Sequence, residues 1–266
     1  MDPAISTKSF DCTIGAGLAH IVLNQADRGN PIDGEFCREF SLCVAELSER
    51  ADVRSVLISA RGRLFSVGGD LTSLVKQGDA LPRTIKAWTA DLHAAIARMV
   101  RMRAPVVAAV HGNVAGGSVS LMAAADLVVI AESARISSAF SKIGFSPDSG
   151  STTTVTRRIG VARARRFFLL AETLDAKTAL SLGLVDIVVS DGDVQRQAER
   201  IARELAAGPT EAYGAIKRLF SQTLDRSLES QLEEEAQTLA AISRTADARE
   251  GVRAFVEKRK PVFVGW

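Results

Sequence analysis

The sequence predicts an α/β fold with a largely parallel sheet, followed by a helical C-terminal part. Two observations lead to this class. In the first half of the chain, short β-branched runs alternate with longer segments of helical periodicity, which is typical of βαβ layering. After residue 160, nearly every segment has apolar side chains at helical spacing. We therefore expect a strand-rich core over residues 1–195 and a helical part over residues 196–266.

The N-terminal half begins with a segment of alternating polarity, residues 8–23, around Gly15-Ala16-Gly17. This pattern predicts a β-hairpin. The next segment, residues 34–50, has Phe36, Phe40 and other apolar side chains at helical spacing. The remaining elements of this half alternate. Strands are expected over 55–59, 105–110 and 126–131, and helices over 84–102 and 119–125.

The C-terminal half is expected to be mostly helical. Only VDIVV, residues 185–189, has the composition of a strand. Helices are expected over 161–171, 176–182, 192–206, 209–222 and 228–247.

Composition excludes several classes of function. The 266 residues are 47% apolar and carry a net charge of only +2, which gives no reason to expect a nucleic-acid partner. Cys12, Cys37 and Cys43 have no zinc-like spacing with one another or with a histidine, so we expect free thiols and no metal site. No apolar run reaches the ~18–20 residues of a membrane span, and the first ten residues lack the features of a secretory signal. A cytoplasmic protein is expected.

Two glycine-bearing loops each follow a predicted strand. FSVGGDL contains Gly68-Gly69, and GNVAGGS contains Gly116-Gly117 and leads into an apolar helix. Loops at the carboxyl edge of a parallel sheet are typical ligand sites, and amides at a helix start favour an anion. Two such loops that converge would form an oxyanion hole. The alternative is that both are ordinary strand-to-helix turns, and neither loop matches a nucleotide-binding motif or a nucleophile elbow.

Four segments in order resemble the crotonase (enoyl-CoA hydratase/isomerase) superfamily. They are RLFSVGGDL, APVVAAVHGNVAGGSVSLMAAADLVVIAESARI, FSKIGFSPDSGSTTTVTRRIG and AKTALSLGLVDIVV. The resemblance runs from about residue 10 to residue 263. It implies a spiral core of repeated ββα units, with C-terminal helices that form a homotrimer or homohexamer. It also implies an acyl-CoA thioester substrate, of which coenzyme A is a part, whose thioester oxygen is held by the amides of Gly69 and Gly117.

The resemblance also identifies what is missing. The two hydratase glutamates of the family correspond to Ser120 and Phe140, so hydratase activity is doubtful, because water addition needs an acid and a base. Asp148, in Ser146-Pro-Asp-Ser-Gly150, resembles the acidic position of isomerase branches, most closely the epoxyphenylacetyl-CoA isomerases. A single carboxylate suffices for a 1,3-proton shift, and apolar neighbours should raise its pKa. The alternative is that Asp148 is a turn or helix N-cap residue.

Two further hypotheses remain open. His93 and Asp148 correspond to the general base and the aspartate nucleophile of the 4-chlorobenzoyl-CoA dehalogenase branch, which implies an aryl-CoA dehalogenase or hydrolase. Phe140 and Gly69 depart from that branch, where aromatic residues orient the aspartate and the aryl ring. The third hypothesis is a non-catalytic CoA-binding member of the family.

The resemblance places coenzyme A near residues 24–30, with the backbone of Ala26 and the side chain of Arg28 as contacts. Arg63 and Lys260 are further candidates, because the phosphates of coenzyme A need cations. In the family, a C-terminal lysine can reach the ligand of a neighbouring subunit. The alternative for residues 258–260 is a solvated helix end.

Overall fold

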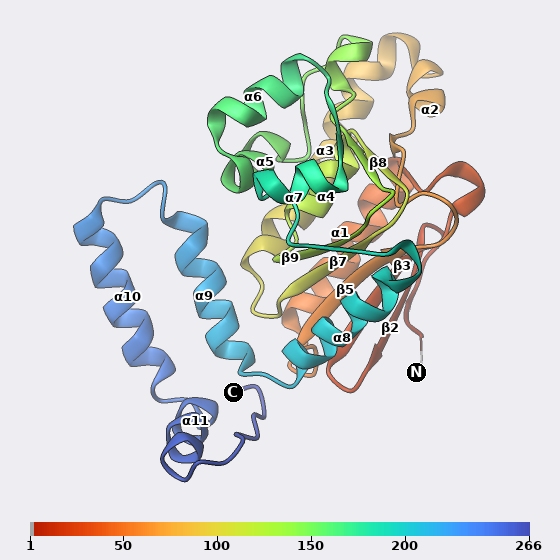
Figure 1. Cartoon of the computed structure of the whole chain (residues 1–266). Coiled ribbons are helices and arrows are strands. Elements are labelled where there is room, and N and C mark those ends of the chain that lie inside the picture. The colour runs from red at the N-terminus through yellow and green to blue at the C-terminus, as the bar shows by residue number, and fades with distance from the viewer. Residues whose placement is uncertain (1–2) are drawn as a thin grey trace.

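A seven-stranded sheet of order β1-β2-β3-β5-β7-β9-β12 forms the centre of the molecule in a computed structural model that describes residues 3–266 (Figure 1). β2 and β3 form the predicted antiparallel hairpin. From β3 to β12, neighbouring strands run parallel, as the alternation of strands and helices predicts. The strands of this sheet are β1 (Pro3–Ser6), β2 (Phe10–Gly15), β3 (Leu18–Leu23), β5 (Ser55–Ala60), β7 (Val106–Val110), β9 (Leu127–Ala131) and β12 (Ile187–Val189).

Short strands outside this sheet complete a repeated unit. Three times, a long strand is followed by a short strand and then a helix: β5-β6-α2, β7-β8-α4 and β9-β10-α5. β8, β10 and β11 form a three-stranded sheet, and β4 pairs with β6. This repetition confirms the expected spiral of ββα units. The short strands are β4 (Pro31–Ile32), β6 (Gly68–Gly69), β8 (Asn113–Ala115), β10 (Arg135–Ser137) and β11 (Thr173–Asp175).

Helices cover the sheet on both sides. α8 packs on β5, β7 and β9 and lies in front of the strands in the view of Figure 1, with α1 behind them. α1 starts at its N-cap Asp33, whose carboxylate accepts a 3.0 Å hydrogen bond from the amide of Phe36. Phe36 and Phe40 stack, and both meet the ring of Phe10 edge-on. The predicted division at residues 195–196 falls at the start of α8.

The helices of the chain are α1 (Gly34–Glu49), α2 (Leu71–Val75), α3 (Leu81–Arg101), α4 (Gly117–Ala123), α5 (Ser151–Ile159), α6 (Val161–Leu169), α7 (Ala176–Leu182), α8 (Val194–Ala206), α9 (Thr210–Gln222), α10 (Leu228–Ile242) and α11 (Ala246–Val256). Short 3₁₀ helices are η1 (Ala26–Arg28), η2 (Gly78–Ala80), η3 (Phe140–Ile143) and η4 (Asp191–Asp193).

The last three helices extend away from the sheet (Figure 1). α9 is fastened to the core by Lys217, whose buried ammonium pairs with Asp126 at 2.7 Å and donates to the carbonyl oxygen of Ala104 at 3.0 Å. α10 packs on α9. The prediction of one helix over 228–247 is wrong, because α10 ends at Ile242. Thr245 then caps a new helix, α11, by accepting a hydrogen bond from the amide of Ala248.

Neither a membrane span nor a metal centre can be identified in the part of the chain that the structure describes. No helix within residues 3–266 has both the length and the apolar character needed to cross a bilayer. Over the same residues, no cluster of three or more His, Cys, Asp or Glu side chains could hold a metal ion. The three cysteines are buried and unpaired with one another as disulfides.

Candidate active site

A cavity of about 410 Å³ lies where the two glycine-bearing loops meet α3 and the segment after β10. We call it the apolar cavity. Gly69, Gly117 and Asp148 all line it, so the structure brings these three predicted residues together. Most of the remaining wall is apolar, and includes Ile32, Leu74, Ile85, Trp88, Leu92 and Phe140. Cys37 also lines it, and burial raises the pKa of its thiol to about 12, which keeps the thiol neutral.

The first loop depends on glycine at position 68. Gly68 has a φ of +82°, and a β-carbon there would lie 2.3 Å from the carbonyl oxygen of Ala115. Gly69 differs, because a β-carbon there would meet no atom within 4 Å. The pairing of β6 with β4 uses the amide of Asp70, which donates to the carbonyl oxygen of Ile32 at 3.1 Å. Gly69 therefore lines the apolar cavity with backbone that no neighbouring atom covers on the side of a β-carbon.

The second loop places Gly117 at the start of α4. Gly116 has φ +55° and ψ −130°, a conformation that residues with side chains rarely adopt. Gly117 is the first residue of α4, so its amide has no hydrogen-bond acceptor within that helix. The two loops touch, since a β-carbon at Gly116 would lie 4.0 Å from the α-carbon of Gly68.

The carboxylate of Asp148 lies beside this second loop. A β-carbon added at Gly117 would lie 3.5 Å from Oδ1 of Asp148. The same Oδ1 accepts a 3.0 Å hydrogen bond from the hydroxyl of Ser149. Burial raises the pKa of Asp148 above the ordinary carboxyl value, against the Ser149 hydrogen bond and nearby His93, which lower it. A carboxylate with a raised pKa is a stronger base than an exposed one.

The alternative role for Asp148, as a helix cap, does not fit its contacts. α5 begins after Gly150, and no side chain caps that helix. The turn is made by the backbone oxygen of Asp148, which accepts from the amide of Ser151 at 2.9 Å. The carboxylate itself faces the apolar cavity.

His93 lies near Asp148 but does not line the apolar cavity. It is exposed on α3 and lines a second cavity of about 750 Å³, which also reaches Asp148 and Ser149. Its Nε2 accepts a 3.1 Å hydrogen bond from the amide of Ser149. The lone pair that a general base would use is therefore already occupied.

Ser120 and Ser149 have roles that sequence reasoning missed. Ser149 has a φ of +55°, which is strained for a residue with a side chain. The Ser120 hydroxyl is hydrogen-bonded to the carbonyl oxygen of Ser149 and lies 3.2 Å from the hydroxyl of Thr154. Ser120 thus anchors the residue that holds Asp148. Phe140 packs against Phe168 with ring centroids 6.3 Å apart.

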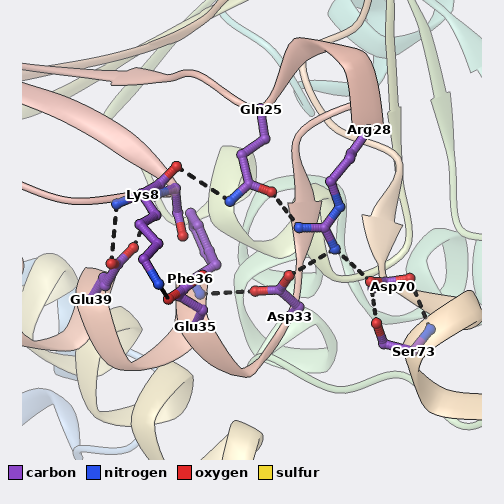
Figure 2. Close-up of polar contacts among 10 residues, drawn as sticks. Lys8, Gln25, Arg28, Asp33, Glu35, Phe36, Glu39, Asp70 and Ser73 are labelled. Atoms are coloured by element: carbon purple, nitrogen blue, oxygen red, sulfur yellow. Dashed lines mark hydrogen bonds and ion pairs between the residues drawn. The ribbon is translucent and has the colours of Figure 1, made fainter. Parts of the chain in front are cut away.

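Figure 2 shows how the loop of Gly69 is anchored. The guanidinium of Arg28 lies between Asp33 and Asp70, at 2.9 and 2.7 Å, and also donates to Gln25 at 2.6 Å. Asp70, directly after Gly69, caps α2 by accepting from the amide of Ser73 at 3.0 Å. Arg28 therefore joins η1, the start of α1 and the loop of Gly69.

The other candidate coenzyme A contacts fall in two places. Ala26 lies against the loop that holds Arg63, since a β-carbon at Gly62 would come within 2.7 Å of the Ala26 side chain. Arg63 is exposed. Lys260 follows α11, in a segment that bonds back to that helix through Val262 and Glu250. Within one chain the structure brings Ala26 and the loop of Arg63 together, and the roles of all four residues stay predictions.

Comparison with known proteins identifies the family of the chain. The family model for enoyl-CoA hydratase/isomerase matches residues 13–265. A protein of Rhodobacter capsulatus named "Probable enoyl-CoA hydratase" is 36% identical over 252 residues, which cover 95% of this chain and 96% of the relative. The 1,2-epoxyphenylacetyl-CoA isomerase of Escherichia coli is 33% identical, with 94% of this chain and 95% of the relative covered.

Two further comparisons agree. The trans-2-decenoyl-[acyl-carrier-protein] isomerase of Streptococcus mutans is 31% identical, over 94% of this chain and 95% of the relative. The crystal structure of an enoyl-CoA hydratase from Polaromonas sp. JS666 superposes with a TM-score of 0.90 at 29% identity, over 96% of this chain and 99% of that chain. The chain therefore belongs to the enoyl-CoA hydratase/isomerase family of acyl-CoA enzymes, within the crotonase superfamily.

Proposed function

We propose that this chain is an enoyl-CoA-type isomerase in which Asp148 alone moves the proton. The observation that carries the proposal is the place of the Asp148 carboxylate, in the wall of the apolar cavity and next to Gly117. Two relatives, from Escherichia coli and Streptococcus mutans, are also named as isomerases of acyl thioesters. These names support isomerisation as the class of reaction, and the position of Asp148 supports a proton transfer.

The reaction would proceed in two proton transfers. With a 3-enoyl thioester, Asp148 takes a proton from C2, and the electron pair of that C–H bond moves into a dienolate. The charge collects on the thioester oxygen, where the amides of Gly69 and Gly117 donate hydrogen bonds that strengthen as the charge grows. Protonated Asp148 then returns the proton to C4, which shifts the double bond to C2–C3.

Hydration is the less suitable reaction for this site. Adding water needs one group to activate the water and another to deliver a proton. Ser120 is buried and its hydroxyl is bound to Ser149 and Thr154, and Phe140 has no titratable group. One carboxylate remains, which is the number that a 1,3-shift requires.

The coenzyme A part of the substrate would lie along η1 and the loop of Arg63. The Ala26 backbone and the exposed Arg63 are our candidates for the adenosine and phosphate contacts, and Arg28 is a third. Lys260 is our candidate for a contact with the ligand of a neighbouring copy. We also propose a homotrimer or homohexamer, because α10 and α11 expose large apolar side chains, including Leu228, Leu239, Phe255 and Val256.

The test is turnover of a panel of thioesters by the full chain and by Asp148→Asn. The panel contains a 3-enoyl-CoA, a dienoyl-CoA and 1,2-epoxyphenylacetyl-CoA. The isomeric products are separated from the substrates before they are detected by mass spectrometry. We expect at least one isomerised product, and a loss of about 10²–10⁴-fold in kcat for the Asn variant. Thermal shift with the unreactive saturated thioester is the binding control, and both proteins should respond to it equally. Unchanged turnover by Asp148→Asn refutes the proposed base.

A second candidate, aryl-CoA dehalogenation or hydrolysis, is favoured by one observation. His93 and Asp148 line the same second cavity, where a water molecule could reach both. In that reaction Asp148 would form an ester with the substrate, and His93 would activate the water that cleaves it. A single turnover in heavy-oxygen water separates the two candidates, because only the ester route transfers an oxygen of Asp148 to the product. Tight binding of thioesters without any turnover would instead favour a non-catalytic protein.

A further inference from the structure

Asp148 stands between two cavities of different character. On one side is the apolar cavity, and on the other is the second cavity of about 750 Å³ between α3, α5 and the end of α9. Asp148 and Ser149 line both. The two spaces therefore meet at Asp148, the residue that the proposed function uses as its base.

The second cavity is suited to water. Its wall includes hydroxyl and charged groups from three elements, among them Thr152, Thr153, Arg157, Ser221 and Asp225. Thr152, Thr153 and Arg157 are exposed. Arg157 donates to the carbonyl oxygen of Ser221 at 2.6 Å and lies 3.6 Å from Asp225. Polar groups of this kind hold water rather than an acyl chain.

The apolar cavity has the opposite character once substrate is bound. Its wall is mostly aliphatic and aromatic, and an acyl group that fills it displaces the water there. Asp148 can then contact solvent only through the second cavity. This asymmetry decides where a proton held on Asp148 can go.

We propose that Asp148 exchanges its proton with solvent through the second cavity during turnover. The inference rests on the proposed isomerase function. After the carboxylate takes a proton from C2, the O–H group has two fates. It returns the proton to C4, or it trades it with a water molecule of the second cavity and delivers a solvent proton instead. No oxidant or further reactant is required, because a proton enters for each proton that leaves.

Ala97 offers a way to close this route. It is exposed on α3 and lines the second cavity, so Ala97→Phe places a ring in that space. Thr153→Leu replaces a hydroxyl group with a larger aliphatic side chain in the wall formed by α5. Ala94 is the matched control, because it is also exposed on α3 but outside the lining of both cavities.

The experiment follows trans-3-hexenoyl-CoA in deuterium oxide at low conversion, with deuterium at C4 of the product measured by mass spectrometry. We expect the product of the unsubstituted protein to carry solvent deuterium. Ala97→Phe and Thr153→Leu should lower that fraction about twofold or more, with turnover retained, because return of the substrate proton competes with exchange. Ala94→Phe should match the unsubstituted protein.

Two outcomes would overturn the inference while leaving the isomerase function intact. One is a product free of solvent deuterium, which means that the proton never leaves Asp148. The other is an equal deuterium fraction in Ala97→Phe, Thr153→Leu and Ala94→Phe, which means that exchange takes another path. A failure of the proposed function has a different signature, since trans-3-hexenoyl-CoA and the other panel thioesters would not be isomerised at all.

Discussion

The two sides of the candidate active site are held in place by different kinds of contact. On one side, the loop of Gly69 is anchored by charges, through the ion pairs of Arg28 with Asp33 and Asp70 (Figure 2). On the other side, the Asp148 carboxylate accepts from the Ser149 hydroxyl, and Ser120 and His93 position Ser149. Among the residues that the structure describes, no Lys or Arg forms an ion pair with Asp148.

The difference fits what the proposed reaction requires of each side. The Gly69 side contributes an amide, whose usefulness depends on where it points and not on a protonation state. The ion pairs of Arg28 suit this side because they fix the position of the loop that carries the amide. In the proposed reaction Asp148 is the proton acceptor, whose strength depends on its pKa, and a cation within contact distance would lower that pKa. Neutral hydrogen bonds hold the carboxylate while keeping it basic.

The largest effect in this comparison should come from removing the ion pairs of the Gly69 side. Arg28→Met leaves Asp33 and Asp70 facing each other without the cation between them, so the loop of Gly69 should lose its fixed position. We expect kcat to fall about tenfold, because small misplacements of a group that binds the transition state are costly. Steady-state kinetics on the best substrate of the panel gives the number.

The control for this variant separates two roles of Arg28. Arg28→Lys keeps the charge and should restore part of the rate, although an ammonium cannot match the planar fork of Arg. If Arg28 acts instead as a ligand of coenzyme A phosphates, Arg28→Met should weaken CoA binding with kcat unchanged. Isothermal titration with free coenzyme A decides between an anchor and a phosphate contact.

The next effect comes from adding a charge to the Asp148 side. His93→Lys places a permanent ammonium where the imidazole ring now accepts from Ser149. A nearby cation favours the ionised carboxylate, so the pKa of Asp148 should fall and the acid limb of the kcat profile should move to lower pH. We expect a shift of about one unit, at the low end for such pairs, because position 93 is exposed and screened.

His93→Gln is the matched neutral variant. Its side-chain oxygen can still accept from Ser149, so both the rate and the profile should stay close to those of the unsubstituted protein. Loss of turnover in His93→Gln would contradict the isomerase reading and favour the hydrolase in which His93 activates water. Equal profiles for the Lys and Gln variants would mean that charge near Asp148 does not matter.

The sequence was sufficient for the long elements and insufficient for the short ones. The runs that predict β5, β7 and β9 are β-branched and apolar because those strands are buried on both faces. β4 and β6 have only two residues each, and β8, β10 and β11 three, which is too short for a periodic signal. The break between α10 and α11 was missed because apolar spacing continues across it, although Thr245 is a good N-cap residue.

The candidate site divides in the same way. Gly69, Gly117 and Asp148 could be proposed from motifs, because each lies in a local pattern of recognisable residues. The anchors could not, since Ser120 reaches Ser149 across 29 residues and Arg28 reaches Asp70 across 42. Nothing in the local sequence marks the positive φ of Ser149. These contacts exist only once the ββα units are wound together.

The smallest effect is on stability, and its sign should differ between the two sides. Asp148 has a raised pKa, so as pH rises above about 3.9 the unfolded chain ionises before the folded one, and stability falls until the folded pKa is passed. Asp148→Asn removes this loss and should raise Tm by at most a few degrees at pH 7, with no gain at pH 3.

For Asp70, burial is outweighed by the Ser73 hydrogen bonds and Arg28, which lower its pKa. Its ionised form therefore stabilises the fold above the unfolded pKa, and Asp70→Asn should lower Tm at pH 7. Melting curves of both variants at the two pH values test the pair, and shifts of the same sign at pH 7 would contradict the distinction between a charged anchor and a neutral one.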